Sequence, residues 1–159
     1  MNNKKICIVC NKDEAKEGFS YCKKCYRDYQ KVYREEHKGY YLYIVLDENN
    51  KVLYVGATEK IYQRISAHIN GHSNIKDLML SDKWSCIKYL DITNLVSNRE
   101  EMLLLENSLI ELYNTEWNDK KNIIRNVDKL REFELISQVH SLDKVWTTYC
   151  KNEHKKMLL

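Results

Sequence analysis

Four of the six cysteines in this 159-residue sequence form two close pairs near its start. Cys7-x-x-Cys10 and Cys22-x-x-Cys25 are separated by eleven residues, a spacing that is typical of a four-thiolate zinc site. Two disulfides are disfavoured because nothing in the sequence resembles a secretion signal, and an iron–sulfur cluster is the remaining alternative. Zn²⁺ bound by four thiolates keeps no open position, so we expect a structural ion here rather than a catalytic one.

A second group of reactive side chains begins with two tyrosines, Tyr43 and Tyr54. Tyr41–Leu46 is rich in aromatic and branched apolar residues, which favours a strand, and polar turn formers follow it. Lys51–Val55 then predicts a return strand that ends at Gly56. Such a hairpin would bring the two tyrosines close together, although each alone could be an ordinary strand aromatic.

The segment after this hairpin predicts a helix that carries a cation and an imidazole. Thr58 is the expected N-cap residue of this helix. Arg64 and His68 would lie roughly 40° apart around the helix axis, beside the apolar residues Ile61 and Ile65. A cation and an imidazole next to a core-facing stripe suit a functional site, whereas a solvated arginine is the structural alternative.

A carboxylate lies within the apolar face of another predicted helix, Arg99–Asn114. Glu106 occupies the middle of the face formed by Met102, Leu103, Leu109, Ile110 and Tyr113. A buried carboxylate is costly unless it has a cation, a hydrogen-bonding partner or a solvated cleft. Glu106 is therefore either half of a structural ion pair or a metal ligand.

In order and spacing, these residues resemble the GIY-YIG nuclease family. The family's Gly-Ile-Tyr signature corresponds to Tyr41-Leu42-Tyr43, and its Tyr-Ile-Gly signature corresponds to Tyr54-Val55-Gly56. Tyr41 replaces the first glycine, while Leu42 and Val55 replace isoleucines. These departures lie at strand positions, so they concern local packing rather than the chemistry.

The downstream motifs extend the resemblance from Tyr40 to about Asn118, roughly half the chain. Arg64 lies eight positions after Gly56, and His68 completes the Arg-x-x-x-His arrangement. Glu106 and Asn118 correspond to the family's glutamate and asparagine.

The resemblance implies metal-dependent hydrolysis of DNA phosphodiester bonds. Tyr43 would take a proton from water, with Tyr54 orienting the phosphate or sharing that task. Arg64 would contact the phosphate oxygens, and Glu106 would hold Mg²⁺ or Mn²⁺. His68 could accept a proton or bind phosphate, so the identity of the general base stays open.

Substrate contacts are also expected at Gly56 and Asn118. A free tyrosine has a pKa of about 10, so Tyr43 needs neighbouring cations that favour its phenolate.

The competing function is an inactive, zinc-dependent module that binds DNA or protein.

Basic charge is concentrated in the N-terminal segment, as a phosphate-binding surface requires. Met1–Lys38 has ten Lys/Arg and six Asp/Glu, a balance of +4, whereas the remaining 16 basic and 17 acidic residues give −1. A helix is predicted from Tyr21 to Lys38, with its basic side chains available to DNA: Lys23, Lys24, Arg27 and Lys31. Its tyrosines, Tyr26, Tyr29 and Tyr33, are expected to pack on the core rather than to stack on bases.

Together the patterns predict an α+β fold in which helices flank a small antiparallel sheet of three strands, the third being Trp84–Asp91. We expect a zinc module at residues 1–38, a nuclease-like core at 39–118 and a helical extension at 119–159. The extension should contain helices at Val127–Val139 and Leu142–Leu158 that pack on the core, form a homodimer or touch DNA.

The sequence contains no apolar run long enough to cross a membrane, so we expect no membrane partner. A cytoplasmic location is expected, with a phage-infected or mobile-element-bearing cell as one setting.

Overall fold

The computed structural model of the protein describes residues 5–36, 38–142 and 146–151. The chain divides into two compact units, Met1–Lys38 and Gly39–Leu159, and each is described by itself. The second unit contains both the predicted core and the predicted C-terminal extension.

The first unit consists of two short loops followed by helix α1 (Lys23–Glu36). The loops are tied by an isolated bridge between Ile6 and Glu14, and the unit has no other sheet among its described residues. Asn11 follows the first cysteine pair in the left-handed conformation, at φ 52°, and its N–H donates to the Cys7 carbonyl. This tight turn brings the two sulfurs of the first pair to the same side of the loop.

Two tyrosines of α1 pack inside the first unit. The Tyr26 ring lies 5.2 Å from the Phe19 ring, and Tyr29 stacks on Tyr21 at 6.1 Å. These ring contacts join α1 to the preceding loops, while Tyr29 and Phe19 remain exposed to solvent. The side chain of the third tyrosine, Tyr33, lies outside the described residues.

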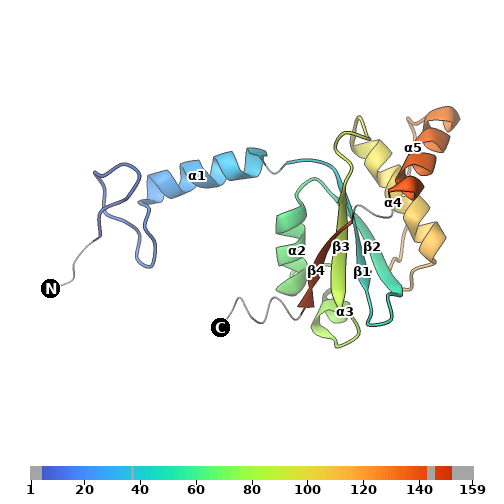
Figure 1. Cartoon of the computed structure of the whole chain (residues 1–159), viewed down its shortest axis with the longest axis horizontal. Coiled ribbons are helices and arrows are strands. Elements are labelled where there is room, and N and C mark those ends of the chain that lie inside the picture. Colours follow the sequence, from blue (N-terminus) through green and yellow to red (C-terminus); the bar gives the residue numbers. More distant parts are fainter. Residues whose placement is uncertain (1–4, 37, 143–145, 152–159) are drawn as a thin grey trace. The chain divides into compact units, whose positions relative to one another are not determined.

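The second unit is built on an antiparallel sheet with the strand order β2-β1-β3-β4 (Figure 1). Its strands are β1 (Tyr41–Leu46), β2 (Val52–Thr58), β3 (Cys86–Asp91) and β4 (Thr147–Cys150). The α+β prediction is confirmed, and the predicted three strands are corrected to four.

Strand β4 replaces part of the helix predicted at Leu142–Leu158. Thr147, Thr148 and Tyr149 favour an extended backbone, and the free edge of β3 supplies the hydrogen-bonding partner. Residues 143–145 and 152–159 of that predicted helix lie outside the described residues.

Helices cover both faces of this sheet (Figure 1). Alternate residues of β1 point to opposite sides, so that Leu42 and Ile44 join one apolar cluster while Tyr43 and Val45 join the other. The first cluster includes α4 (Arg99–Tyr113) and α5 (Lys129–Ser141), and the second includes α2 (Ile61–Ile69) and α3 (Lys76–Leu80). None of the described helices is long and apolar enough to span a bilayer.

The start of α2 differs from the prediction. Thr58 belongs to β2, and Lys60 is the N-cap residue. The Thr58 hydroxyl instead accepts the Lys60 N–H at 3.1 Å, which turns the chain from the strand into the helix. By contrast, Asn98 caps α4 in the usual way by accepting the Glu101 N–H at 3.0 Å.

Helix α5 packs on α4, which is one of the three arrangements considered for the C-terminal extension. Arg131 donates to both carboxylate oxygens of Glu101, at 3.0 and 3.1 Å, and to the Leu95 carbonyl. Leu135 and Val139 of α5 are buried in the apolar cluster that also contains residues of α4. The homodimer through this region stays a prediction.

Candidate active site

Four of the predicted catalytic side chains line one cavity of about 600 Å³. Tyr43 comes from β1, Tyr54 from β2, Arg64 from α2 and Glu106 from α4. Residues far apart in sequence therefore meet because the hairpin, α2 and α4 all contribute to the lining of this cavity. The rest of the lining is formed by Ala57, Gly71, His72, Ser73, Asn74, Arg99, Leu103 and Asn122.

His68, the fifth predicted residue, lies behind Tyr43 rather than in the lining. Its Nε2 is 2.8 Å from the Tyr43 hydroxyl, and its Nδ1 is 2.7 Å from the Ser73 hydroxyl. His68 is fully buried, which leaves these two hydroxyls as the partners of its ring nitrogens. The three side chains form a hydrogen-bonded chain that reaches the cavity through Tyr43.

The burial of this chain keeps both rings neutral at pH 7. Burial, and to a lesser degree the Arg64 cation, lower the pKa of His68 to about 4. Burial is also the main reason that the pKa of Tyr43 lies well above its ordinary value, and the opposing effect of Arg64 is smaller. The expected stabilisation of a Tyr43 phenolate by cations is therefore outweighed in the free protein.

Gly56 provides the space that the Tyr43 ring occupies. The two residues are partners across the β1–β2 pair, and a Cβ on Gly56 would lie 2.1 Å from Cζ of Tyr43. Only a residue without a side chain allows this approach. Tyr54 lies near the same ring, with centroids 6.1 Å apart. The predicted Tyr54-Val55-Gly56 segment thus supplies one of the two tyrosines, and its glycine leaves room for the ring of the other, Tyr43.

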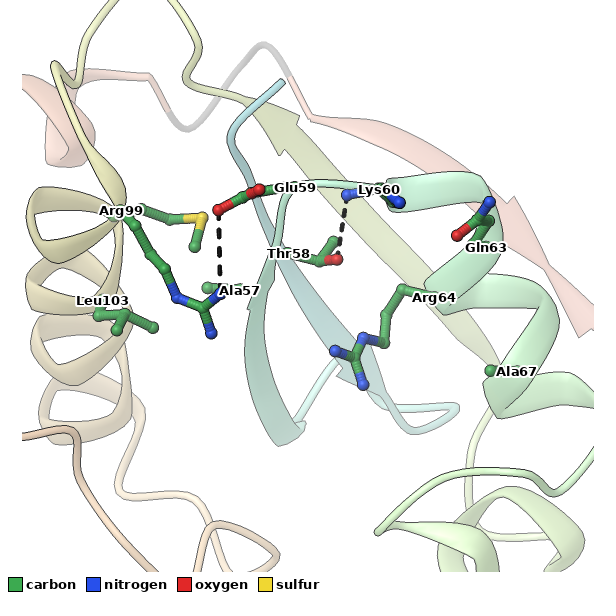
Figure 2. A pocket seen from close by; sticks show the side chains of 10 residues that line it. Ala57, Thr58, Glu59, Lys60, Gln63, Arg64, Ala67, Arg99 and Leu103 are labelled. Atoms are coloured by element: carbon green, nitrogen blue, oxygen red, sulfur yellow. Dashed lines mark hydrogen bonds and ion pairs between the residues drawn. The ribbon is translucent and has the colours of Figure 1, made fainter. Parts of the chain in front are cut away.

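Arg64 is exposed and extends from α2 over β2 (Figure 2). Within the described part of the chain, no carboxylate lies within ion-pair distance of its guanidinium, so this cation can bind an external anion. A planar guanidinium suits two phosphate oxygens at once.

Glu106 is half-buried and faces the cavity. Burial raises the pKa of its carboxyl group, while hydrogen bonds from the Asn122 side chain and the Ala57 backbone oppose that shift. The Asn122 amide donates to one oxygen of Glu106. One oriented carboxylate in a water-accessible cavity fits Mg²⁺ or Mn²⁺, which bind few protein ligands and retain several waters.

Asn122 lies in a segment without helix or strand, so no periodic pattern pointed to it. Asn118, which was predicted to contact substrate, lies outside this cavity lining. Its amide accepts the Val55 N–H at 2.9 Å and donates to the Val55 carbonyl at 2.8 Å. These bonds fix the outer edge of β2.

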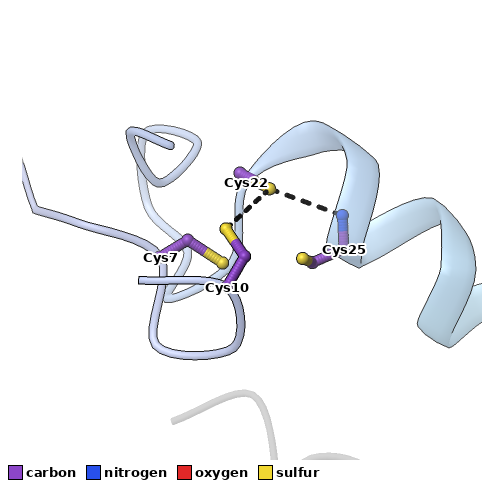
Figure 3. A group of neighbouring side chains, drawn as sticks. All are labelled: Cys7, Cys10, Cys22 and Cys25. Atoms are coloured by element: carbon purple, nitrogen blue, oxygen red, sulfur yellow. Dashed lines mark hydrogen bonds between the residues drawn. The ribbon is translucent and has the colours of Figure 1, made fainter. Parts of the chain in front are cut away.

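The four N-terminal cysteines form a separate cluster in the first unit (Figure 3). Their sulfurs all lie within 4.8 Å of one another, and those of Cys10 and Cys22 are 3.9 Å apart. Zn–S bonds of about 2.3 Å in a tetrahedron require sulfurs about 3.8 Å apart, so the donor set fits zinc. The Cys25 N–H donates to the Cys22 sulfur, and backbone N–H groups lower the pKa of Cys7 to about 6.

The remaining two cysteines do not join this cluster. Cys86 and Cys150 face each other across β3 and β4 in the second unit. Elsewhere in the described residues, no group of three or more His, Cys, Asp or Glu side chains has this arrangement.

The basic side chains predicted to contact DNA are exposed on α1. Four of them lie within about 100° of the helix surface, given the α-helical repeat: Lys23, Lys24, Arg27 and Lys31. The helix thus presents a basic face beside the cysteine cluster of its own unit.

Comparison with known proteins gives one family and one group of relatives. Residues 39–122 match a family model described as the GIY-YIG catalytic domain. The chain is 34% identical over 95 residues to the UvrABC system protein C of Mycoplasma capricolum, covering 60% of this chain and 15% of that protein. It is 32% identical over 119 residues to the same protein of Porphyromonas gingivalis strain W83, covering 72% and 19%. The chain thus spans less than a fifth of the length of these relatives, and no solved structure matches significantly.

Proposed function

The chain belongs to the GIY-YIG nuclease family, and from this premise we propose that it is a metal-dependent endonuclease that hydrolyses phosphodiester bonds in DNA. The match to a catalytic domain confirms the predicted family and enzyme class. The observation that carries the proposal is the cavity into which Tyr43, Tyr54, Arg64 and Glu106 converge.

Tyr43 and His68 are proposed to act together as the general base. The Tyr43 oxygen accepts a proton from the attacking water while the Tyr43 proton passes to Nε2 of His68. This requires the tautomer in which Nδ1–H of His68 donates to Ser73. The water oxygen bonds to phosphorus, the bond to the leaving oxygen breaks, and the leaving oxygen takes a proton from solvent.

Bound DNA would also favour this transfer electrostatically. A phosphate in the cavity offsets the Arg64 cation that helps to lower the pKa of His68. Arg64 would contact the non-bridging oxygens, where negative charge grows in the transition state. Tyr54 lies within reach to orient the same phosphate.

Glu106 would hold the divalent ion, with Asn122 fixing the orientation of its carboxylate. When bound, Mg²⁺ or Mn²⁺ supplies positive charge near the leaving oxygen. The cysteine cluster would hold zinc and order α1, whose basic face would add affinity for DNA.

Nicking of supercoiled plasmid provides the test. We expect cleavage with Mg²⁺ or Mn²⁺, none with a chelator in excess, and none for Glu106→Gln, which should still bind DNA. Arg64→Ala should lower the rate by about a hundredfold or more while the protein remains folded.

Defined duplex, branched and single-stranded substrates would then show which DNA structure is cut. Binding of DNA without cleavage under all conditions would favour the inactive binding module instead. Full activity of Glu106→Gln would contradict the proposed site.

A further inference from the structure

A second cavity of about 300 Å³ adjoins the one just described (Figure 2). The two cavities share four lining residues: Ala57, Arg64, Leu103 and Arg99. Arg64 and Arg99 extend from α2 and α4 on either side of β2 (Figure 2), and both line the two cavities. The other residues around the second cavity are Thr58, Glu59, Lys60, Gln63, Ala67 and Met102.

The charges around the second cavity favour an anion. Lys60, Arg64 and Arg99 contribute three cations, and Glu59 is the one carboxylate in this lining. The Arg99 guanidinium is 3.9 Å from the Glu59 carboxylate, and their side chains are 70% and 30% exposed. A long, exposed ion pair of this kind contributes little stability, so Arg99 can exchange Glu59 for another anion at small cost.

Arg99 is also close to the proposed reaction centre. It lines the same cavity as Arg64 and Glu106, so both cations border the space in which that carboxylate lies. A DNA strand whose scissile phosphate lies beside Arg64 and Glu106 must continue in both directions along its backbone. The second cavity is the space into which one of these directions leads from Arg64.

We propose that the second cavity is the subsite for the phosphate next to the scissile one, with Arg99 and Lys60 as its cationic contacts. Glu59 holds Arg99 in the free protein and releases it when DNA binds. The inference rests on the proposed nuclease function, because the scissile phosphate defines the position of its neighbour. Guanidinium–phosphate pairing is strong and geometrically specific, which suits a contact that sets the register of the strand.

DNA affinity of the full chain in the Glu106→Gln background provides the first test. Adding Arg99→Ala should weaken binding of a short duplex by about tenfold at low salt and reduce the salt slope by about one. Glu59→Gln should act in the opposite sense and tighten binding by a few-fold. Arg125→Ala is the matched control, because Arg125 is an exposed arginine that lines neither cavity.

A neutral methylphosphonate linkage provides the second test, after the cleaved bond has been mapped. Placed at the phosphate on one side of that bond, it should weaken binding by the parent protein about as much as Arg99→Ala does. The same linkage should then have little further effect on the Arg99→Ala variant, which is the signature of a direct contact. On the opposite side of the bond, the linkage should affect both proteins equally.

The two tests separate this inference from the proposed function. Equal losses in both proteins at each neighbouring phosphate would overturn the subsite even if the enzyme cleaves DNA. If Arg99→Ala loses its fold by circular dichroism, unchanged affinity of Glu59→Gln overturns the inference by itself. Cleavage by the Glu106→Gln parent would instead overturn the proposed catalytic site, and absence of DNA binding by that parent would overturn both.

Discussion

At the scale of single residues, the proposed general base depends on the environment of His68. A fully buried imidazole cannot touch water or substrate directly, so it can act only through its hydrogen-bonded neighbours, and the Tyr43 hydroxyl lies 2.8 Å from its Nε2. The sequence left open whether Tyr43 or His68 is the base, and the geometry favours a shared role. This role depends on which ring nitrogen of His68 carries the proton, and Ser73 is the group that sets it.

We therefore expect His68→Ala to lower kcat by about a hundredfold or more, the usual contribution of a general base. Ser73→Ala should have a smaller effect, because it removes the tautomer control but leaves the proton acceptor. Single-turnover cleavage rates at saturating DNA would measure both. If the cleavage rate fell equally in both variants and their affinity for DNA also changed, the two residues would have a structural role instead.

The pKa of His68 also predicts how stability depends on pH. Its folded value of about 4 lies below the ordinary 6.5, so the unfolded chain binds the proton more tightly. The contribution of neutral His68 to the free energy of unfolding is thus complete above pH 6.5 and is lost as the pH falls toward 4. Urea unfolding of wild type and His68→Gln between pH 4 and 7 should show their difference in free energy of unfolding shrink at the acidic end. A constant difference would contradict the burial effect.

At the scale of elements, β1 and β2 can pair only because Gly56 on β2 leaves room for the ring of Tyr43 on β1. Gly56→Ala would place a methyl group 2.1 Å from the Tyr43 ring. We expect it to destabilise the protein by about 1–3 kcal/mol, the usual cost of overpacking, and to abolish cleavage. In the double variant with Tyr43→Ala, the destabilisation should be less than the sum of the two single changes, as thermal unfolding can show. Strict additivity would mean that the methyl group meets something else.

Local patterns predicted the elements that carry the site, and long-range pairing determined the rest. The hairpin was recognisable from two apolar runs around a polar turn, α2 from its amphipathic repeat, and Glu106 as a charge on an apolar face. Strand β4 could not be foreseen, because four residues that favour an extended backbone form a strand only when β3 offers its edge, and that pairing is long-range. Asn122 and Ser73 come from segments without a repeating pattern, so only the folded chain shows that they support Glu106 and His68.

At the scale of the whole molecule, the two units obtain their stability in different ways. The first has short loops, one helix and a few aromatic contacts, whereas the second has apolar clusters on both faces of its sheet. A module this short commonly needs a metal to fold. Zinc removal should therefore unfold residues 5–36 and leave the second unit folded.

Hydrogen exchange before and after chelation would measure this difference, with elemental analysis giving one zinc per chain. Replacing Cys22 and Cys25 by serine should weaken DNA binding and its salt dependence more than the chemical step. Replacing Cys86 and Cys150 instead is the matched control and should leave the zinc content unchanged. A protein purified without zinc, or unchanged cleavage of dilute DNA by the Cys22/Cys25 variant, would contradict this division.

The bonds between Asn118 and β2 have a consequence for solubility. Strand β2 lies at the margin of the sheet, where unpaired backbone groups invite another chain to add a strand. The Asn118 amide satisfies both backbone groups of Val55, and the Trp117 N–H donates to the Leu53 carbonyl, so a single loop imitates a neighbouring strand. Asn118→Ala should leave the Val55 backbone groups unpaired at this edge of the sheet. Light scattering should then detect aggregation at protein concentrations where the wild type does not aggregate. We therefore expect the asparagine of the nuclease motif to protect this chain against edge-to-edge assembly.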